Sequence, residues 1–285
     1  MADPSAPSAP NAPQALRGPV ALLDRWIGFW AAVFELCGAL FYLGEDTASW
    51  AWRGFVSRKV RMGTSAITAQ IVRVGVRSIS IVMLVSGSIG IILALQTSPT
   101  LEEYGQTDKV ANLIGVAVFR ELGPLIAAIV MVGFAGASIA AELGTMVVGE
   151  EVEALEAMGL NPVRYLVVPR LVATVSSLLA LAVVSDLTAV FFGMVVGTTA
   201  LGIPYDLYVS NTIAQLKMTD FVTGLLKAGV FGLLLGLIAC HNGLRVTGGA
   251  AGVGRATTET VVQTVIFVIL SDLFFSTIFY AIGWT

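Results

Sequence analysis

The sequence predicts an all-α integral membrane protein with about five membrane-spanning helices. Of its 285 residues, 56% are hydrophobic and only 12% are charged, whereas a soluble domain carries about 25% charged residues. The mean hydropathy is +0.86, and several apolar runs are long enough to cross a bilayer core, which takes about 20 helical residues. Because lipid offers no hydrogen-bond partners to the backbone, spans of this kind must be helical.

The first 58 residues predict two segments ahead of the spans. Residues 1–20 are rich in Ala, Pro and Ser, which predicts a disordered tail rather than a signal peptide. Residues 21–58 mix charges with many Trp, Phe and Tyr residues, a composition typical of a helix lying in the membrane interface. We therefore expect an interfacial elbow helix at 21–58, with a crossing helix as the alternative, and a transmembrane domain at 59–285.

Five apolar runs follow in order along the chain. The predicted spans are residues 67–95, 110–148, 163–199, 221–240 and 257–282. The first is expected to end at Thr97-Ser98-Pro99. The second would measure about 60 Å as a straight helix, so it must tilt, protrude or bend, and Gly123-Pro124 is the expected bend. Residues 204–217 predict a short amphipathic surface helix between the third and fourth spans.

The basic residues predict the orientation of these spans. With a cytoplasmic N-terminus, twelve of the sixteen Lys and Arg residues lie on or near the inner side, and only Lys109 and Lys217 lie outside. This bias predicts a cytoplasmic N-terminus by the positive-inside rule. The twelve are Arg17, Arg25, Arg53, Arg58, Lys59, Arg61, Arg73, Arg77, Arg164, Arg170, Arg245 and Arg255.

The sequence carries no motif for catalysis or for a bound cofactor. His241 is the only histidine and no lysine follows a glycine, so neither a zinc-protease motif nor a phosphate-binding G-K-[ST] loop is present. Cys37 and Cys240 are expected to be apolar packing residues. We predict no catalytic residue, no metal site and, with a net charge of −3, no nucleic-acid partner. Any ATP must be bound by another chain.

Ionisable residues within the spans are candidates for function. Arg120, Glu121 and Lys227 are predicted to lie about 12–15 Å deep in the outer half of the membrane. Charges at such a depth are costly, so they pair or line a wet path. A polar lipid headgroup could bind there, or the charges could simply pair to fix helix packing. For Asp186 and Asp272 we expect a structural role.

The loop between the second and third spans predicts a short amphipathic helix at 149–160. Apolar residues recur every three positions opposite an acidic face, and Gly159 ends the helix. Such a helix on the cytoplasmic side could dock into the groove of a partner, and a solvated surface helix is the alternative. Its residues are Glu150, Glu151, Val152, Glu153, Leu155, Met158 and Gly159. Nearby, the Gly, Ala and Ser residues at 133–144 predict close helix packing or a dimer seam.

Several linked motifs lie across residues 60–285. They are Arg120-Glu121-Leu122-Gly123-Pro124, Ala141–Met146, Glu150–Leu155, Met158-Gly159, Pro162, Val168-Pro169-Arg170, His241-Asn242-Gly243, Gly252–Thr258 and Val261-Val262. Together these motifs resemble those of the MlaE/YrbE permease family.

The resemblance implies the permease subunit of an ABC complex in the bacterial inner membrane that moves phospholipid or a related lipid. It implies a homodimer, a cytoplasmic ATPase dimer that holds ATP and Mg, and an MCE-domain protein on the outer side. It also implies that 149–160 is the ATPase-coupling helix and that Arg120 and Glu121 lie near a lipid cavity. We add Lys227 as a headgroup ligand, with Leu93 and Leu95 meeting the acyl chains.

Three other functions stay open from the residues alone. An ion-coupled secondary transporter would use Glu121, Asp186 and Asp272 to carry protons. A membrane scaffold without transport activity would use the charges only for packing. A membrane enzyme is the least supported, because no nucleophile, base and metal set is present.

Overall fold

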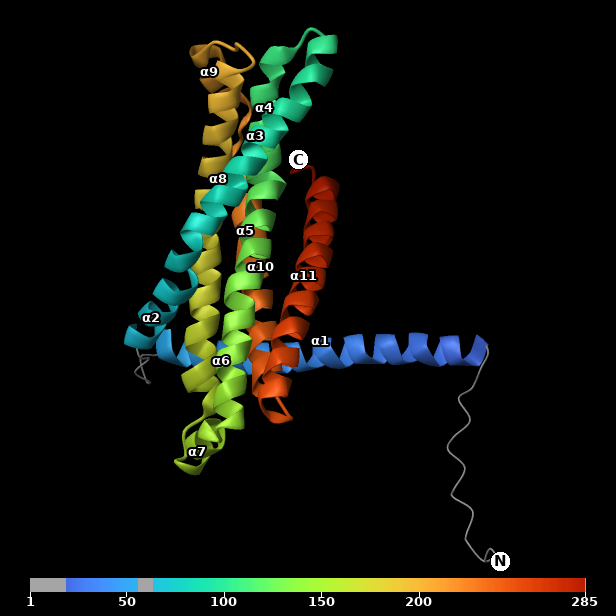
Figure 1. Ribbon diagram of the computed structural model, residues 1–285, viewed down its shortest axis with the longest axis vertical. Helices are drawn as coiled ribbons and strands as arrows, with labels where there is room; N and C mark the ends of the chain where they lie inside the picture. Colours follow the sequence, from blue (N-terminus) through green and yellow to red (C-terminus); the bar gives the residue numbers. More distant parts are fainter. Residues whose placement is uncertain (1–18, 56–63, 285) are drawn as a thin grey trace, which may run out of the picture. The chain divides into compact units, whose positions relative to one another are not determined.

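A computed structural model describes residues 19–55 and 64–284 of the chain, which are helical with short connections and contain no strand (Figure 1). Helix α1 covers Pro19–Phe55. The tail expected at 1–20 lies outside these residues except for its last two, which begin α1. Residues 56–58 of the expected elbow helix also lie outside them.

Five helices in the described residues are long and apolar enough to cross a membrane, as predicted. They cover Ser65–Glu103, Thr107–Val148, Val163–Thr199, Met218–Leu244 and Gly249–Ile282. Helix α1 is not among them. The chain is therefore an all-α, multi-pass membrane protein.

The first span is longer than expected at its C-terminal end. It consists of α2 (Thr64–Val74), a 3-10 turn at Val76–Ser78 and α3 (Ile79–Glu103). The expectation that it ends at Thr97-Ser98-Pro99 is wrong, because α3 continues for four residues beyond Pro99. A proline removes a single N–H donor, and so close to the end of a long helix this loss does not stop it.

The second span is interrupted by two π-helical turns. Its parts are a 3-10 turn at Thr107–Lys109, α4 (Val110–Ala117), the π turn η3 (Val118–Leu122), α5 (Gly123–Met131), the π turn η4 (Val132–Gly136) and α6 (Ala137–Val148). The irregularity expected at Gly123-Pro124 is η3, directly before it. There the Gly123 N–H donates to the Val118 carbonyl, a bond to the fifth preceding residue, ahead of a proline that has no N–H.

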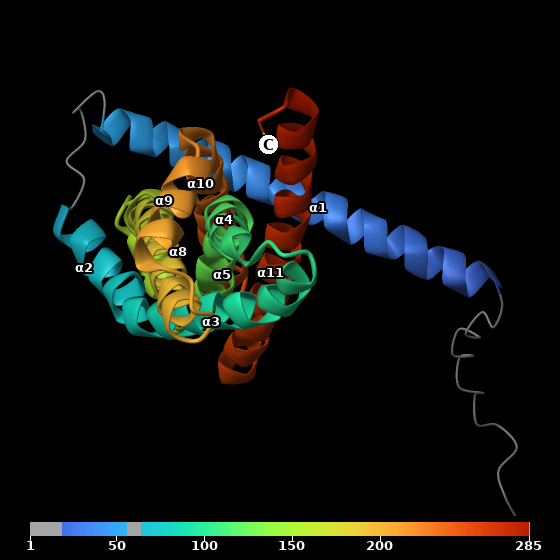
Figure 2. The ribbon, with the colours of Figure 1, turned by 90° about the horizontal axis from the view of Figure 1, so that it is seen from above.

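The remaining helices complete the bundle. They are α7 (Glu151–Ala157), the π turn η5 (Val163–Val167), α8 (Val168–Thr199), α9 (Tyr205–Gln215), α10 (Met218–Leu244) and α11 (Gly249–Ile282). The short helix predicted at 204–217 is confirmed as α9. Helix α8 packs between α3 and α10, and α10 also packs against α6 and α11 (Figure 2). Helices α7 and α9 mark opposite ends of this bundle (Figure 1).

Small residues let the helices approach closely. A Cβ added at Gly232 of α10 would lie 2.9 Å from the Val175 Cα of α8, and one added at Gly144 of α6 would lie 2.8 Å from the Val246 side chain. Gly144 belongs to the small-residue stretch at 133–144, so part of that stretch packs within the chain. A glycine at such a crossing allows contact between backbones, which replaces the hydrophobic driving force that lipid lacks.

Candidate functional site

Lys227 of α10 is the centre of a buried polar cluster. Its side chain is 0% exposed, and its Nζ lies 2.5 Å from Glu121 Oε2 and 2.9 Å from Asp272 Oδ1. It also donates to Ser276 Oγ at 2.7 Å, and Ser276 donates to Glu121 Oε1 at 2.9 Å. Two of the three N–H donors of the ammonium group thus form hydrogen bonds, to Glu121 and Ser276, and Asp272 is an ion-pair partner. The cluster thereby joins η3, α10 and α11.

Arg120 forms a second ion pair beside this cluster. Its Nη2 and Nε donate to Asp220 Oδ1 at 2.6 and 3.1 Å. The other carboxylate oxygen of Asp220 accepts the Lys217 N–H at 3.1 Å at the start of α10. Asp220 was missed by sequence reasoning, since it directly precedes the predicted fourth span. The signal available was an acidic residue three positions after Lys217, as in a helix-start motif.

A glycine sets the distance between η3 and α10. A Cβ added at Gly224 would collide with the carbonyl oxygen of Phe119 and lie 3.3 Å from the Pro124 ring. Gly224 is three residues before Lys227 and four after Asp220, so the close approach occurs between the two ion pairs. Along α10, one cation–carboxylate pair therefore lies on each side of the point where α10 crosses the backbone of η3.

Of the five residues predicted to bind lipid, the structure brings Glu121 and Lys227 into contact. Arg120 pairs separately with Asp220, and both pairs are only partly buried, because the side chains of Arg120 and Glu121 are 23% and 34% exposed. Leu95 is half-exposed on α3, and Leu93 packs against the smaller core cluster near α4 and α9. No contact joins these leucines to the ion pairs among the contacts of the described residues.

The two acidic residues expected to be structural differ in their surroundings. Asp272 is one of the partners of Lys227. Asp186 of α8 is 3% exposed, and its Oδ1 has no hydrogen-bond partner among the described residues. A Cβ added at Gly123 would collide with that oxygen. Asp186 therefore lies against the backbone that follows η3.

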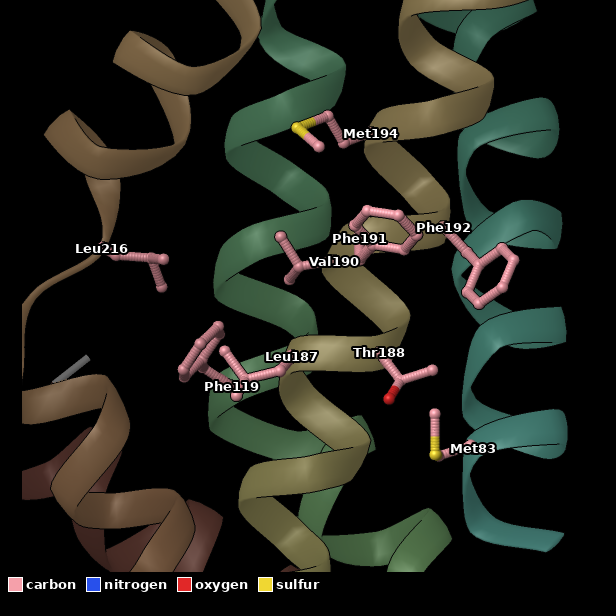
Figure 3. A pocket seen from close by; sticks show the side chains of 9 residues that line it. All are labelled: Met83, Phe119, Leu187, Thr188, Val190, Phe191, Phe192, Met194 and Leu216. Carbon is pink, nitrogen blue, oxygen red and sulfur yellow. The ribbon is translucent and has the colours of Figure 1, made fainter. Parts of the chain in front are cut away.

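An apolar pocket of about 710 Å³ opens beside the C-terminal half of α8. Figure 3 shows that α8 supplies most of its wall, with Met83 across from it on α3, and Phe119 and Leu216 on the other side. Its α8 residues are Leu187, Thr188, Val190, Phe191, Phe192 and Met194. Neither Leu93 nor Leu95 lines this pocket. Sequence reasoning missed it, because an apolar face of a span looks the same whether it is flat or hollow.

A third polar network lies toward the α7 end of the bundle. Glu142 of α6 pairs with Arg73 of α2 at 2.6 Å and with Arg170 of α8 at 3.1 Å. Arg170 also donates to the Leu166 carbonyl at 2.8 Å, and Arg73 lies 3.4 Å from Ser138 Oγ. One carboxylate between two guanidinium groups thus connects three spans, which explains an intramembrane Glu142 in structural terms.

The short helix predicted at 149–160 is present as α7, but its apolar residues do not all face outward. Val152 and Leu155 pack against the main core of the bundle, whereas Met158 is 65% exposed. The helix itself is shorter than 149–160, because Glu150 and Gly159 on either side have positive φ angles of 59° and 74°. Its acidic residues are all exposed. The surface available to a partner is therefore mainly acidic.

The described residues contain no group of three His, Cys, Asp or Glu side chains that could hold a metal ion. The ion pairs are thus the main polar features of the spans.

Comparison with known sequences decides the family. The profile of the family described as Permease MlaE matches residues 67–278. The chain belongs to the MlaE permease family. The match covers three of the five spans completely and most of the first and last, together with both ion pairs, the acidic α7 and the Arg73–Glu142–Arg170 network.

Several relatives of this MlaE permease carry the name of an ABC transporter component. A probable ABC transporter permease protein of Rickettsia felis is 35% identical over 218 residues, which cover 76% of this chain and 84% of the relative. One from Synechocystis is 30% identical over 260 residues, covering 91% and 94%. The chloroplastic protein TRIGALACTOSYLDIACYLGLYCEROL 1 of Arabidopsis thaliana is 30% identical over 211 residues, covering 74% and 60%. The chain is therefore a membrane permease subunit of ABC type, and such a subunit works with an ATPase.

Proposed function

We propose that this permease moves phospholipid or a related lipid between the inner membrane and the outer envelope of a bacterium. In this proposal two copies form a homodimer that binds a cytoplasmic ATPase dimer and an MCE-domain protein on the outer side. ATP and Mg belong to the ATPases, and this chain binds no cofactor. The name of the chloroplastic relative contains that of a galactolipid, which supports a lipid substrate.

The proposal depends mainly on two partly buried ion pairs among apolar helices, Arg120–Asp220 and Lys227–Glu121. The Arg120 side chain is 23% exposed beside Asp220, and a guanidinium can bind a phosphate through two N–H donors. Lys227 holds Glu121 and Asp272, so it would meet a headgroup only by exchanging one of them. Leu95, half-exposed on α3, offers apolar surface for an acyl chain, with Leu93 behind it.

The ATPase would act through α7. Val152 and Leu155 fix this helix to the bundle core, and its exposed acidic side would face the partner. A push on α7 is then transmitted to α6 and α8, the helices that flank it in the chain. The N-terminus and α7 would lie in the cytoplasm, in agreement with the basic residues counted above.

Membership of an ABC permease family favours ATP-driven transport over the ion-coupled transporter and the scaffold. Helix α11 has apolar side chains exposed along its length, a surface that suits lipid as well as a second copy of the chain. They include Val262, Ile266, Ile269, Leu270, Leu273 and Phe274.

The test uses the complex with its ATPase, reconstituted in vesicles that contain labelled phospholipid. We expect Arg120→Ala to reduce ATP-dependent lipid transfer about ten-fold, because one charge-assisted phosphate contact is lost. Arg120→Ala combined with Lys227→Ala should reduce transfer and co-purified lipid further. Lys109→Ala, an exposed lysine outside both pairs, is the matched control.

Assembly must be measured in parallel, since both variants break ion pairs. If the double variant still binds the ATPase and transfers lipid at the normal rate, the headgroup role is wrong and the charges serve packing alone. Transfer that persists without ATPase and collapses with an ionophore would instead support the ion-coupled transporter.

A further inference from the structure

We propose a second lipid site at the α7 end of the bundle, which binds an anionic phospholipid of the inner leaflet. It consists of an apolar groove between the last part of α1, α8 and α10, with two arginines stacked on an aromatic residue at one end. It goes beyond the proposed transport function, because it is separate from the Lys227 cluster in the outer half.

The groove has a volume of about 370 Å³. Its α1 wall is built from small residues at helical spacing, which include Gly44, Ala48 and Ala51, and its α8 wall includes Val175 and Leu179. Small side chains on one helix opposite branched ones on the other leave a channel rather than a packed seam.

The two hydroxyl residues of this groove do not make it polar. Thr47 donates to the Leu43 carbonyl at 2.6 Å, and Ser176 donates to the Val172 carbonyl at 2.6 Å, each within its own helix. The lining therefore has few polar groups to offer a ligand. An apolar chain that fills it would restore the van der Waals contacts that its lining atoms lack.

The cationic end of the site is organised by Trp50. The guanidinium carbon of Arg53 lies 5.3 Å from the centre of the Trp50 ring, and that of Arg164 lies 5.8 Å from it. Arg164 also lies 5.0 Å from the Tyr165 ring. Stacking on an aromatic face fixes the plane of a guanidinium and keeps its in-plane N–H groups directed sideways, where they can bind phosphate oxygens in a bidentate manner.

The cations lie close to residues that line the groove. Trp50 directly precedes Ala51, which lines the groove, and Arg164 precedes Leu171, another lining residue, by seven residues or about 10 Å. Two cations next to an apolar channel fit a phosphate joined to an acyl chain. A soluble anion would use only the cations, and an apolar peptide would use only the groove.

The surroundings suit a lipid headgroup as well. Trp and Tyr side chains are enriched at the headgroup level of membranes. The cluster lies at the α7 end, which the basic residues predict to be cytoplasmic, and that leaflet holds the anionic lipids. A lipid bound to Arg164 would also contact the segment that directly follows the α7 loop.

The experiment uses the full chain with its ATPase partner in nanodiscs of phosphatidylcholine with a minor fraction of phosphatidylglycerol. Native mass spectrometry then measures which lipid stays bound. We expect the wild type to enrich phosphatidylglycerol. Arg53→Gln combined with Arg164→Gln should reduce this enrichment about ten-fold or more, because each arginine contributes about five-fold to the binding of an anionic lipid. Arg255→Gln, an exposed arginine near the start of α11 at the same end of the bundle, should leave it unchanged.

A groove variant tests the acyl chain separately. Ala48→Phe fills the channel without altering charge, and it should reduce phosphatidylglycerol retention while the complex still assembles. Equal retention of both lipids by the wild type, or normal enrichment in the double arginine variant, would overturn the proposal. Displacement of the lipid by inorganic phosphate alone would overturn it in favour of a simple anion site. Cross-linking of two chains through Ala48→Cys in a Cys37→Ser background would show that a second copy fills the groove.

Discussion

Lys227 shows why a cation can be buried in the middle of a span. A lone ammonium in hydrocarbon is strongly disfavoured, whereas here two carboxylates and a hydroxyl surround it. The same contacts make the residue sensitive to substitution, because its removal leaves two carboxylates facing each other without a cation.

Lys227→Met should therefore lower the free energy of unfolding by about 3 kcal/mol, the cost of leaving a buried partner uncompensated. Denaturant unfolding in detergent, followed by tryptophan fluorescence, measures this loss. Lys109→Met, at an exposed lysine, should change stability little.

A triple variant without these charges distinguishes the contribution of charge pairing from that of side-chain packing. Lys227→Met combined with Glu121→Gln and Asp272→Asn removes all three charges and should recover most of the lost stability. Failure to recover would mean that the shape of the Lys227 side chain, rather than its charge, stabilises this site.

Sequence reasoning located Arg120, Glu121 and Lys227 from their depth in the spans, but it could not assign their partners. The pairing of Lys227 with Glu121 spans 106 residues of sequence, and that of Arg120 with Asp220 spans 100. Only the helix arrangement brings such residues together.

Among the helices, α10 shows how one glycine sets the distance between α10 and η3. A Cβ at Gly224 would collide with the Phe119 carbonyl, whereas a Cβ at Gly229 would meet only the Leu179 side chain at an ordinary 3.7 Å. Both glycines lie on the same helix, so their helix propensities nearly cancel in a comparison.

Gly224→Ala should destabilise the protein by about 1–3 kcal/mol, because the backbone of η3 has to move. Gly229→Ala should be neutral or stabilise by up to about 1 kcal/mol through helix propensity. Thermal unfolding of the two variants under the same conditions measures this difference in stability. Equal stabilities would show that η3 adapts to the added methyl group without cost.

Helix α7 leads to a prediction about its partner. Glu153 and Glu156 are exposed, and the apolar side of the helix is already in contact with the bundle. Glu153→Lys combined with Glu156→Lys should weaken binding of the ATPase about ten-fold at low ionic strength, and salt should reduce the difference.

Binding of the purified ATPase to the permease in nanodiscs measures this effect across salt concentrations. Glu102→Lys combined with Glu103→Lys, which changes two exposed residues at the end of α3, makes the same change of charge on the opposite end of the bundle. If both pairs of substitutions weaken binding equally, α7 is not the docking helix.

For the whole molecule, the five spans and the basic residues together predict which end faces the cytoplasm. In a Cys37→Ser background, Glu156→Cys on α7 should react with a membrane-impermeant maleimide only after the cells are permeabilised. Gln106→Cys, at the opposite end before α4, should react in intact cells. Cys240 is buried and should contribute little background. The reverse labelling pattern would place α7 outside and rule out its coupling role.

The sequence by itself determined the class of protein, the number of spans, the short helices α7 and α9, and the family, because lipid as a solvent imposes long apolar helices and because linked motifs are specific. The tertiary structure decided which charges pair, where the apolar pocket and groove lie, and that the apolar side of α7 faces inward. Those features depend on contacts between helices far apart in the chain, and hydropathy along one segment does not specify its neighbours. The continuation of α3 beyond Pro99 has a related cause, since local proline preference is a weaker influence than a long, hydrogen-bonded helix.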